Sequence, residues 1–137
     1  MSDGFRNPSL AVDAICLRNN LAEVLLIRRG RMPWKGKLAF PGGFVDYGEN
    51  PETAALRELR EECGIDGRDP QLYAVKGRPD RDPRKHIVSV FYIVGVDEGC
   101  VPVAGDDAAE AEWIRLDSLV AEDVAGDHFE VIEQLRK

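Results

Sequence analysis

The sequence predicts an α/β (α+β) domain in which helices pack on the faces of a central mixed β-sheet. Apolar and β-branched segments recur on both sides of one sharply delimited helix, and an amphipathic segment closes the chain. Since strands and helices do not alternate regularly, repeated parallel βαβ units are not expected. The 137 residues fit a single domain over 1–137, because compact domains cluster at roughly 100 to 150 residues.

The composition excludes several classes of protein. Hydrophobic residues make up 44% and charged residues 31%, which indicates a globular chain rather than a disordered one. The formal net charge of -7 opposes binding to duplex nucleic acid, so no nucleic-acid partner is expected. An anionic substrate would need a local basic patch or divalent cations beside the carboxylates.

The cysteines and the N-terminus indicate a cytoplasmic protein. Cys16, Cys63 and Cys100 occur singly and without CxxC spacing, which argues against disulfides and a zinc knuckle. The first ten residues lack a basic region followed by an apolar stretch, and no run of about 18 apolar residues occurs. We therefore expect no membrane partner.

The first third of the chain predicts strands and a basic loop. Residues 10–17 and 23–27 are apolar and are expected to pair as a hairpin. The basic segment 28–37 should be a loop that leads into a short strand at 38–40. The sequence Pro-Gly-Gly at 41–43 is expected to break regular structure.

The segment from Glu52 to Cys63 is the best-delimited element and predicts a helix. Asn50 can cap its N-terminus, Pro51 suits the first helical position, and Gly64 can end it. Beyond it we expect strands at 72–75, 86–96 and 112–116 and a terminal amphipathic helix over 127–137. A charged, proline-broken loop is expected at 77–84. His86 and His128 stand alone, and neither is assigned a catalytic role.

Two faces of the predicted helix differ in chemistry. At 100° per residue an apolar stripe forms from Ala55, Leu56, Leu59 and Cys63. Glu58, Glu61 and Glu62 fall together on the far side, where like charges repel. Arg57, Arg60 or bound metal ions could offset that repulsion, and oxygen-rich clusters suit Mg²⁺ or Mn²⁺. On composition alone, a solvated charged face is the alternative.

The full string from Gly43 to Ile65 favours the metal site. It runs Gly43, five residues, Glu49, seven residues, Arg57-Glu58-Leu59, one residue, Glu61-Glu62, one residue, Gly64-Ile65. This pattern resembles the Nudix box at every defining position, and the chain is identified as resembling the Nudix hydrolases. The resemblance implies a Nudix-type α/β/α sandwich around a mixed sheet.

The resemblance also assigns roles within the predicted site. Glu58, Glu61 and Glu62 would ligate Mg²⁺, or Mn²⁺ in its place, and the carbonyl of Gly43 could add a ligand. Arg57 would orient the carboxylates by ion pairing. The proton acceptor would be Glu61 or a loop acid, and Asp107, in the acidic segment 106–112, is the loop acid we single out. An acidic solvent-facing loop is the alternative for Asp107.

Outside the box, the chain resembles the ADP-ribose pyrophosphatase subgroup. Pro79 lies fifteen residues beyond Gly64, and the segments 32–45 and 78–94 also look like that subgroup. A small-molecule nucleotide substrate needs cations for phosphate and apolar faces for its base. The candidates for substrate binding are Arg28, Arg29, Trp34, Arg81 and Arg84, although each arginine alone suits an ordinary surface charge and Trp34 suits loop packing.

Several functions stay open at this point. The leading hypothesis is hydrolysis of ADP-ribose to AMP and ribose 5-phosphate; the alternatives are a triphosphate-sanitising pyrophosphatase and a sugar-nucleotide hydrolase. A non-catalytic ADP-ribose sensor is a different class. Such regulators typically carry an added DNA-binding domain, for which 137 residues leave no room, and often a degraded box. The resemblance is also compatible with a homodimer.

Overall fold

The computed structural model describes residues 6–105 and 107–137. The strands are β1 (Ser9–Ile15), β2 (Leu17–Arg18), β3 (Glu23–Arg29), β4 (Leu38–Ala39), β5 (Gly42–Phe44), β6 (Arg68–Lys76), β7 (Ile87–Gly95) and β8 (Ala108–Arg115). The helices are α1 (Pro51–Cys63) and α2 (His128–Leu135), with two short 3₁₀ turns at Leu116–Ser118 and Ala121–Asp123. None of the described helices is long and apolar enough to cross a membrane.

The strands divide between two four-stranded sheets. The first has the order β5-β1-β7-β6, in which β1 and β7 are parallel and the other pairs antiparallel. In the second, β2, β4 and β8 all pair antiparallel with β3. The predicted mixed α/β class is confirmed. Strand β6 extends beyond the range expected at 72–75, whereas β8 begins earlier than the range expected at 112–116 and ends at Arg115.

The hairpin expected between the first two apolar segments is wrong over most of its length. β1 pairs with β5 and β7, and only the two residues of β2 pair with β3. The chain changes sheets at Cys16, which is fully buried. Because Val12 and Ala14 are also fully buried, β1 needs neighbours on both sides, and a two-stranded hairpin would not supply them.

The glycine pair after Pro41 belongs to a strand rather than to a break. Gly42 lies opposite Asp13 and Gly43 opposite Val12 in the pairing of β5 with β1. A Cβ atom on Gly42 would lie 2.2 Å from the carbonyl oxygen of Val12, so only glycine allows this approach. Because of this close approach, the middle of β1 and the end of α1 both lie beside the short strand β5.

Helix α1 begins and ends where the sequence predicts. The side chain of Asn50 accepts a hydrogen bond from the Glu52 N–H at 2.9 Å, and Pro51 occupies the first turn. Gly64 adopts the left-handed conformation, with φ of 66°, and its N–H donates to the Arg60 carbonyl. The predicted stripe is also observed, since Ala55, Leu59 and Cys63 are buried and Leu56 packs against them.

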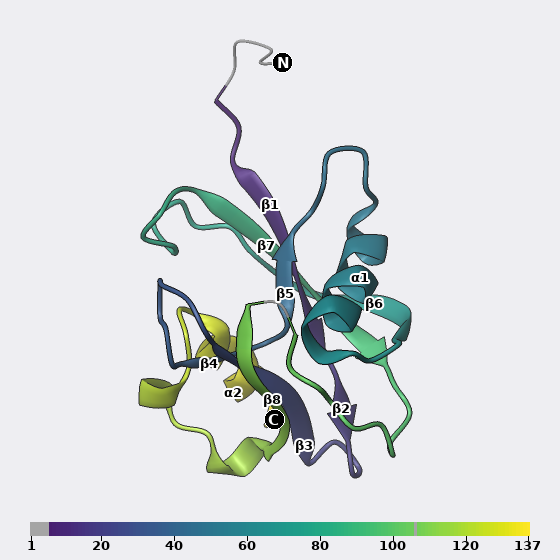
Figure 1. The fold of residues 1–137 in the computed structure, drawn as a ribbon. Helices are drawn as coiled ribbons and strands as arrows, with labels where there is room; N and C mark the ends of the chain where they lie inside the picture. The colour runs from purple at the N-terminus through teal and green to yellow at the C-terminus, as the bar shows by residue number, and fades with distance from the viewer. Residues whose placement is uncertain (1–5, 106) are drawn as a thin grey trace.

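The two helices cover opposite faces of the strands, which gives the expected α/β/α layers (Figure 1). Alternation along β3 shows this directly. Leu25 and Ile27 join the apolar cluster beneath α1, whereas Val24 and Leu26 join the cluster that contains residues of α2. The predicted C-terminal helix is confirmed over His128–Leu135 and buries Val131 and Ile132 completely.

Candidate active site

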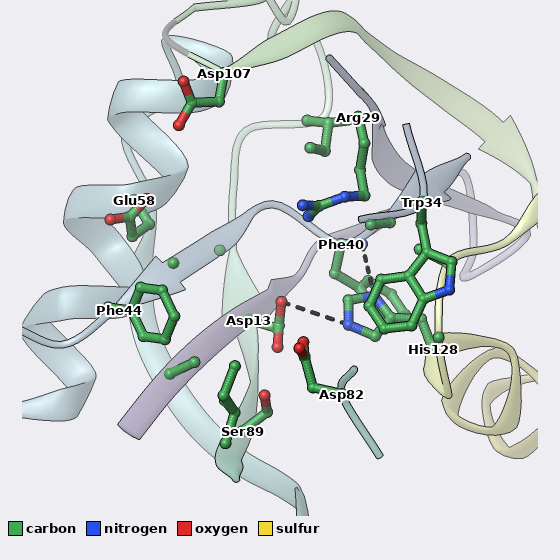
Figure 2. Close-up of a pocket in the computed structure, with 18 of the residues that line it drawn as sticks. Asp13, Arg29, Trp34, Phe40, Phe44, Glu58, Asp82, Ser89, Asp107 and His128 are labelled. Carbon is green, nitrogen blue, oxygen red and sulfur yellow. Dashed lines mark hydrogen bonds and ion pairs between the residues drawn. The ribbon is translucent and has the colours of Figure 1, made fainter. Parts of the chain in front are cut away.

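A cavity of about 550 Å³ lies between α1, the strands β1, β3, β5 and β7, the start of α2, and the loops at 30–34, 81–84 and 125–127. Figure 2 shows its two ends. Glu58 of α1 and Asp107 lie at one end, while Trp34, Phe40 and His128 surround the other. We call the first the acidic end.

Arg57 organises the acidic end. Its guanidinium donates from Nε and Nη2 to both oxygens of Glu49, at 2.8 and 3.0 Å. The Nη1 group donates to Glu58 at 2.8 Å and to Glu61 at 3.1 Å, and Nη2 also donates to the Phe44 carbonyl. One cation therefore holds three carboxylates in a common arrangement and offsets part of their mutual repulsion.

Glu62 is buried. Its residue exposure is only 6%, whereas the side chain of Glu61 is 43% exposed. The Gly42 N–H donates to Glu62 Oε1 at 3.0 Å. Burial raises the pKa of Glu62 to about 7 against that hydrogen bond, and the neighbouring charges of Glu58 and Asp107 act in the same direction as burial. A uniformly solvated charged face, the alternative for these glutamates, is therefore wrong for Glu62.

The backbone of β5 approaches the carboxylate of Glu58. A Cβ atom on Gly43 would lie 2.5 Å from the carboxyl carbon of Glu58 and 2.6 Å from each of its oxygens. Gly43 is therefore needed to bring carbonyl-bearing backbone against this acid. Carboxylates beside a backbone segment form the kind of oxygen-rich donor set that Mg²⁺ or Mn²⁺ prefers.

The acidic end is not a closed metal cage. Within residues 6–105 and 107–137, no three side chains of the metal-binding types stand together in ion-binding geometry. Magnesium usually keeps several waters and is held by one or two carboxylates plus substrate phosphates. The residues present therefore fit an ion that is shared with a phosphate substrate better than a permanently enclosed one.

Asp107 reaches the acidic end through a loop fastened to α1. The Val103 N–H donates to the Cys63 carbonyl and the Gly105 N–H to the Glu62 carbonyl, each at 2.9 Å. Asp107 lines the cavity, and its carboxylate forms a 2.8 Å ion pair with Arg31. Its neighbour Asp106, part of the acidic segment noted in the sequence, lies outside the described residues.

Four of the five residues expected to bind substrate line the cavity. These are Arg29, Trp34, Arg81 and Arg84. Arg28 points elsewhere, because its guanidinium donates to Glu110 at 2.9 Å and to the Gly36 carbonyl at 2.8 Å, and it is not part of the described cavity lining. Alternation along β3 explains this, since neighbours on a strand point to opposite faces.

Sequence reasoning missed Asp13, Asp82 and His128, which all line the cavity. Asp13 is 6% exposed, and burial raises its pKa well above the ordinary range. Burial lowers the pKa of His128 to about 4. For Asp13 the sequence did offer a signal, because it is a single acid within the apolar run at 10–17, where an unpaired charge would be costly.

The ion pair of Glu49 with Arg57 makes a testable contribution to stability. Hydrogen bonds from Arg57, and then from the Asp46 N–H, lower the pKa of Glu49 from 4.5 to about 2. Because the folded-state pKa is depressed, the stabilisation is present above pH 4.5 and is lost as the pH falls towards about 2.

We expect Glu49→Gln to reduce the free energy of unfolding at about pH 6 and to matter less at about pH 3. Urea unfolding of the wild type and the variant at both pH values measures the difference. Glu133→Gln, at an exposed position of α2, is the matched control. A cost of Glu49→Gln that stays the same at both pH values would contradict the role of the ionised carboxylate.

Comparison with known proteins agrees with this geometry. The model of the NUDIX domain family matches residues 7–135. The chain therefore belongs to the NUDIX domain family, and the resemblance read from residues 43–65 is confirmed. It is 43% identical over 129 residues to the ADP-ribose pyrophosphatase of Methanocaldococcus jannaschii, covering 94% of this chain and 73% of that enzyme.

Two solved structures have similar folds. The NUDIX domain of Shewanella oneidensis NrtR, complexed with ADP ribose, superimposes with a TM-score of 0.85 at 28% identity, covering 96% of this chain and 88% of that one. A bifunctional NMN adenylyltransferase/ADP ribose pyrophosphatase from Francisella tularensis, complexed with AMP and a manganese ion, gives 0.80 at 28% identity. The latter match covers 97% of this chain but 42% of that protein. Another structure of the Shewanella protein contains a 27mer DNA.

Proposed function

We propose that this protein is a metal-dependent Nudix pyrophosphohydrolase that cleaves ADP-ribose to AMP and ribose 5-phosphate. The observation that carries the proposal is the acidic end itself, where Arg57 holds Glu49, Glu58 and Glu61 beside the buried Glu62. A solvent-exposed helix would gain little from this arrangement, because surface ion pairs contribute about 0 to 1 kcal/mol. The archaeal relative supports the choice of substrate.

The residues of the acidic end would divide the work. Glu58, Glu61, Glu62 and the carbonyl of Gly43 would hold Mg²⁺ or Mn²⁺. When bound, such an ion draws electron density from phosphate oxygens and makes hydroxide available near neutral pH. Arg57 keeps the carboxylates oriented before the substrate arrives, so less reorganisation is needed during the reaction.

Other side chains would bind the substrate and accept a proton. Arg29 and Arg31 line the cavity and supply positive charge for the diphosphate. Glu61, partly exposed and held by Arg57, and Asp107, paired with Arg31, are the two proposed proton acceptors. Trp34 offers an apolar face to a base or sugar.

Three expectations from the sequence remain predictions. They are the absence of a nucleic-acid partner, a cytoplasmic location, and a homodimer. The Shewanella protein bound to DNA makes the first of these worth a direct binding measurement.

Product analysis tests the proposed function. The protein is incubated with ADP-ribose, oxidised nucleoside triphosphates and sugar nucleotides, with Mg²⁺ or Mn²⁺ and with a chelator. We expect metal-dependent release of AMP from ADP-ribose, faster than release of pyrophosphate from the triphosphates. Strong triphosphate cleavage without ADP-ribose cleavage would reject this substrate, and ADP-ribose binding without cleavage would indicate a sensor.

A further inference from the structure

A polar compartment occupies the end of the cavity away from Glu58, beside Trp34 (Figure 2). We define it by the lining residues Asp13, Arg81, Asp82, Asp127 and His128. The compartment contains more carboxylates than a phosphate-binding pocket would be expected to have.

The guanidinium of Arg81 is already engaged by the protein. It donates from Nε and Nη2 to the two oxygens of Asp127, at 2.8 and 2.7 Å. Its Nη1 group donates to Ser89 Oγ at 2.8 Å and to the Ile87 carbonyl at 3.2 Å. Both side chains of the ion pair are nearly buried, with exposures of 7% and 12%. This cation is a fixed part of the wall and would have to break a bidentate pair to receive a phosphate.

The second guanidinium at this end is paired in the same way. Arg84 donates from Nε and Nη2 to the two oxygens of Asp82, each at 3.0 Å. The side chain of Asp82 is 8% exposed, so the carboxylate lies inside the cavity wall. Two of the four arginines that the sequence marks for substrate binding, Arg81 and Arg84, thus each balance one carboxylate.

His128 adds a neutral hydrogen-bond donor. Its Nδ1 accepts from the Phe40 N–H at 3.2 Å, so the proton of the neutral ring resides on Nε2. Nε2 faces Asp13 Oδ1 at 3.8 Å, a distance longer than a hydrogen bond (Figure 2). Because burial lowers the pKa of His128 to about 4, the ring carries no positive charge at neutral pH.

Asp13 completes the compartment. Strand β5 approaches its carboxyl closely, since a Cβ atom on Gly42 would lie 2.5 Å from Oδ1. Burial raises the pKa of Asp13 well above the ordinary range, although the charges of Arg81 and Arg29 oppose this shift. Because Arg81 and Arg84 are paired with carboxylates and His128 is neutral, none of the five residues that define the compartment offers an unpaired positive charge.

We propose that the compartment takes an uncharged, hydroxyl-bearing end of the substrate, and that the pairing of Arg81 with Asp127 and of Arg84 with Asp82 determines specificity by leaving neither arginine free for an additional phosphate there. The carboxyl of Asp13 beside a neutral imidazole N–H and an aromatic wall suits a pentose or nucleoside, whose hydroxyls and amino groups form hydrogen bonds. A phosphate in the same place would meet carboxylates whose cations are already paired. The inference rests on the proposed function, because it concerns the ends of an internal diphosphate.

Two phosphorylated analogues of ADP-ribose test the proposal. One carries an added phosphate on the adenosine ribose and the other on the terminal ribose. We expect one of the two to show kcat/KM reduced on the order of 100-fold relative to ADP-ribose, because like charges brought together without a counter-ion are strongly disfavoured. The analogue that is rejected identifies which end of the substrate enters the compartment.

The Asp82→Asn variant connects the rejection to the pairing of the arginines. It keeps the shape of the side chain, removes its charge and releases Arg84 to meet a phosphate, so the discrimination should fall by at least about tenfold. Asp80→Asn removes an equal charge from an exposed position of the same loop and should leave the discrimination unchanged. If Asp82→Asn does not fold by circular dichroism, Asp82→Ser replaces it, and the analogue comparison on the wild type stands by itself.

Equal cleavage of ADP-ribose and both analogues would overturn the proposal, as would discrimination that Asp82→Asn leaves intact. Equilibrium binding of the three compounds, followed by tryptophan fluorescence in the Trp113→Phe background and in the presence of a chelator, separates this outcome from failure of the proposed function. If ADP-ribose is not hydrolysed but binding still rejects one analogue, the compartment is supported and the catalytic proposal fails. If hydrolysis occurs and neither assay discriminates, only the compartment fails.

Discussion

Glu62→Gln is expected to reduce kcat for ADP-ribose by on the order of 1,000-fold, because metal-ion catalysis contributes several kcal/mol. Glutamine keeps an oxygen that can accept the hydrogen bond from the Gly42 N–H, which is 3.0 Å long with Glu62 in place. It removes the negative charge that would hold a divalent ion. Initial rates at saturating substrate, over a range of Mg²⁺ and Mn²⁺ concentrations, measure the loss.

Stability measurements distinguish this effect from unfolding. Since burial disfavours the ionised form of Glu62, replacing it with a neutral amide should leave the free energy of unfolding unchanged or higher in the absence of metal. Glu133→Gln, exposed on α2, serves again as the matched control and should retain full turnover. Wild-type kcat in Glu62→Gln would remove this residue from the metal site.

Gly42→Ala is expected to cost about 3 kcal/mol of unfolding free energy, at the upper end of the usual penalty for overpacking. The added methyl would lie 2.2 Å from the Val12 carbonyl oxygen and 3.0 Å from the Asp13 Cα, and neither backbone atom can rotate away. Strand β5 would have to separate from β1. Urea unfolding measures the change, from the shift in midpoint and the slope.

Gly99→Ala is the control for this substitution. A Cβ atom at Gly99 would meet nothing within 4 Å, so we expect an effect within about 0.5 kcal/mol. If Gly42→Ala were as stable as Gly99→Ala, the close pairing of β5 with β1 would be wrong.

The parts of the fold that the sequence predicts well are those specified by local chemistry. Asn50, Pro51 and Gly64 define α1 through contacts within a few residues, and the structure has the helix at those bounds. The ion pair of Arg57 with Glu61 also follows from their spacing of four residues along one helix. Such features do not depend on how distant segments are brought together.

The parts that the sequence does not predict depend on distant contacts. The parallel pairing of β1 with β7 joins residues that are almost eighty positions apart, and adjacency in sequence favours the hairpin instead. Gly42 and Gly43 indicate a break by composition, yet they form a strand in which β1 leaves no room for a side chain at Gly42 and Glu58 leaves none at Gly43. Asp13 lies within an apolar run, and His128, whose Nε2 lies 3.8 Å from it, comes from the other end of the chain.

The two ends of the cavity are built on different supports. The carboxylates of the acidic end stand on α1, a helix fixed at both termini, whereas the far wall comes mainly from loops at 29–34, 81–84 and 125–127. Loops tolerate insertion and substitution far better than a capped helix does. Substitutions in these loops can therefore change which molecules the cavity accepts while the carboxylates on α1 keep their positions. Selectivity can then change without a loss of reaction rate.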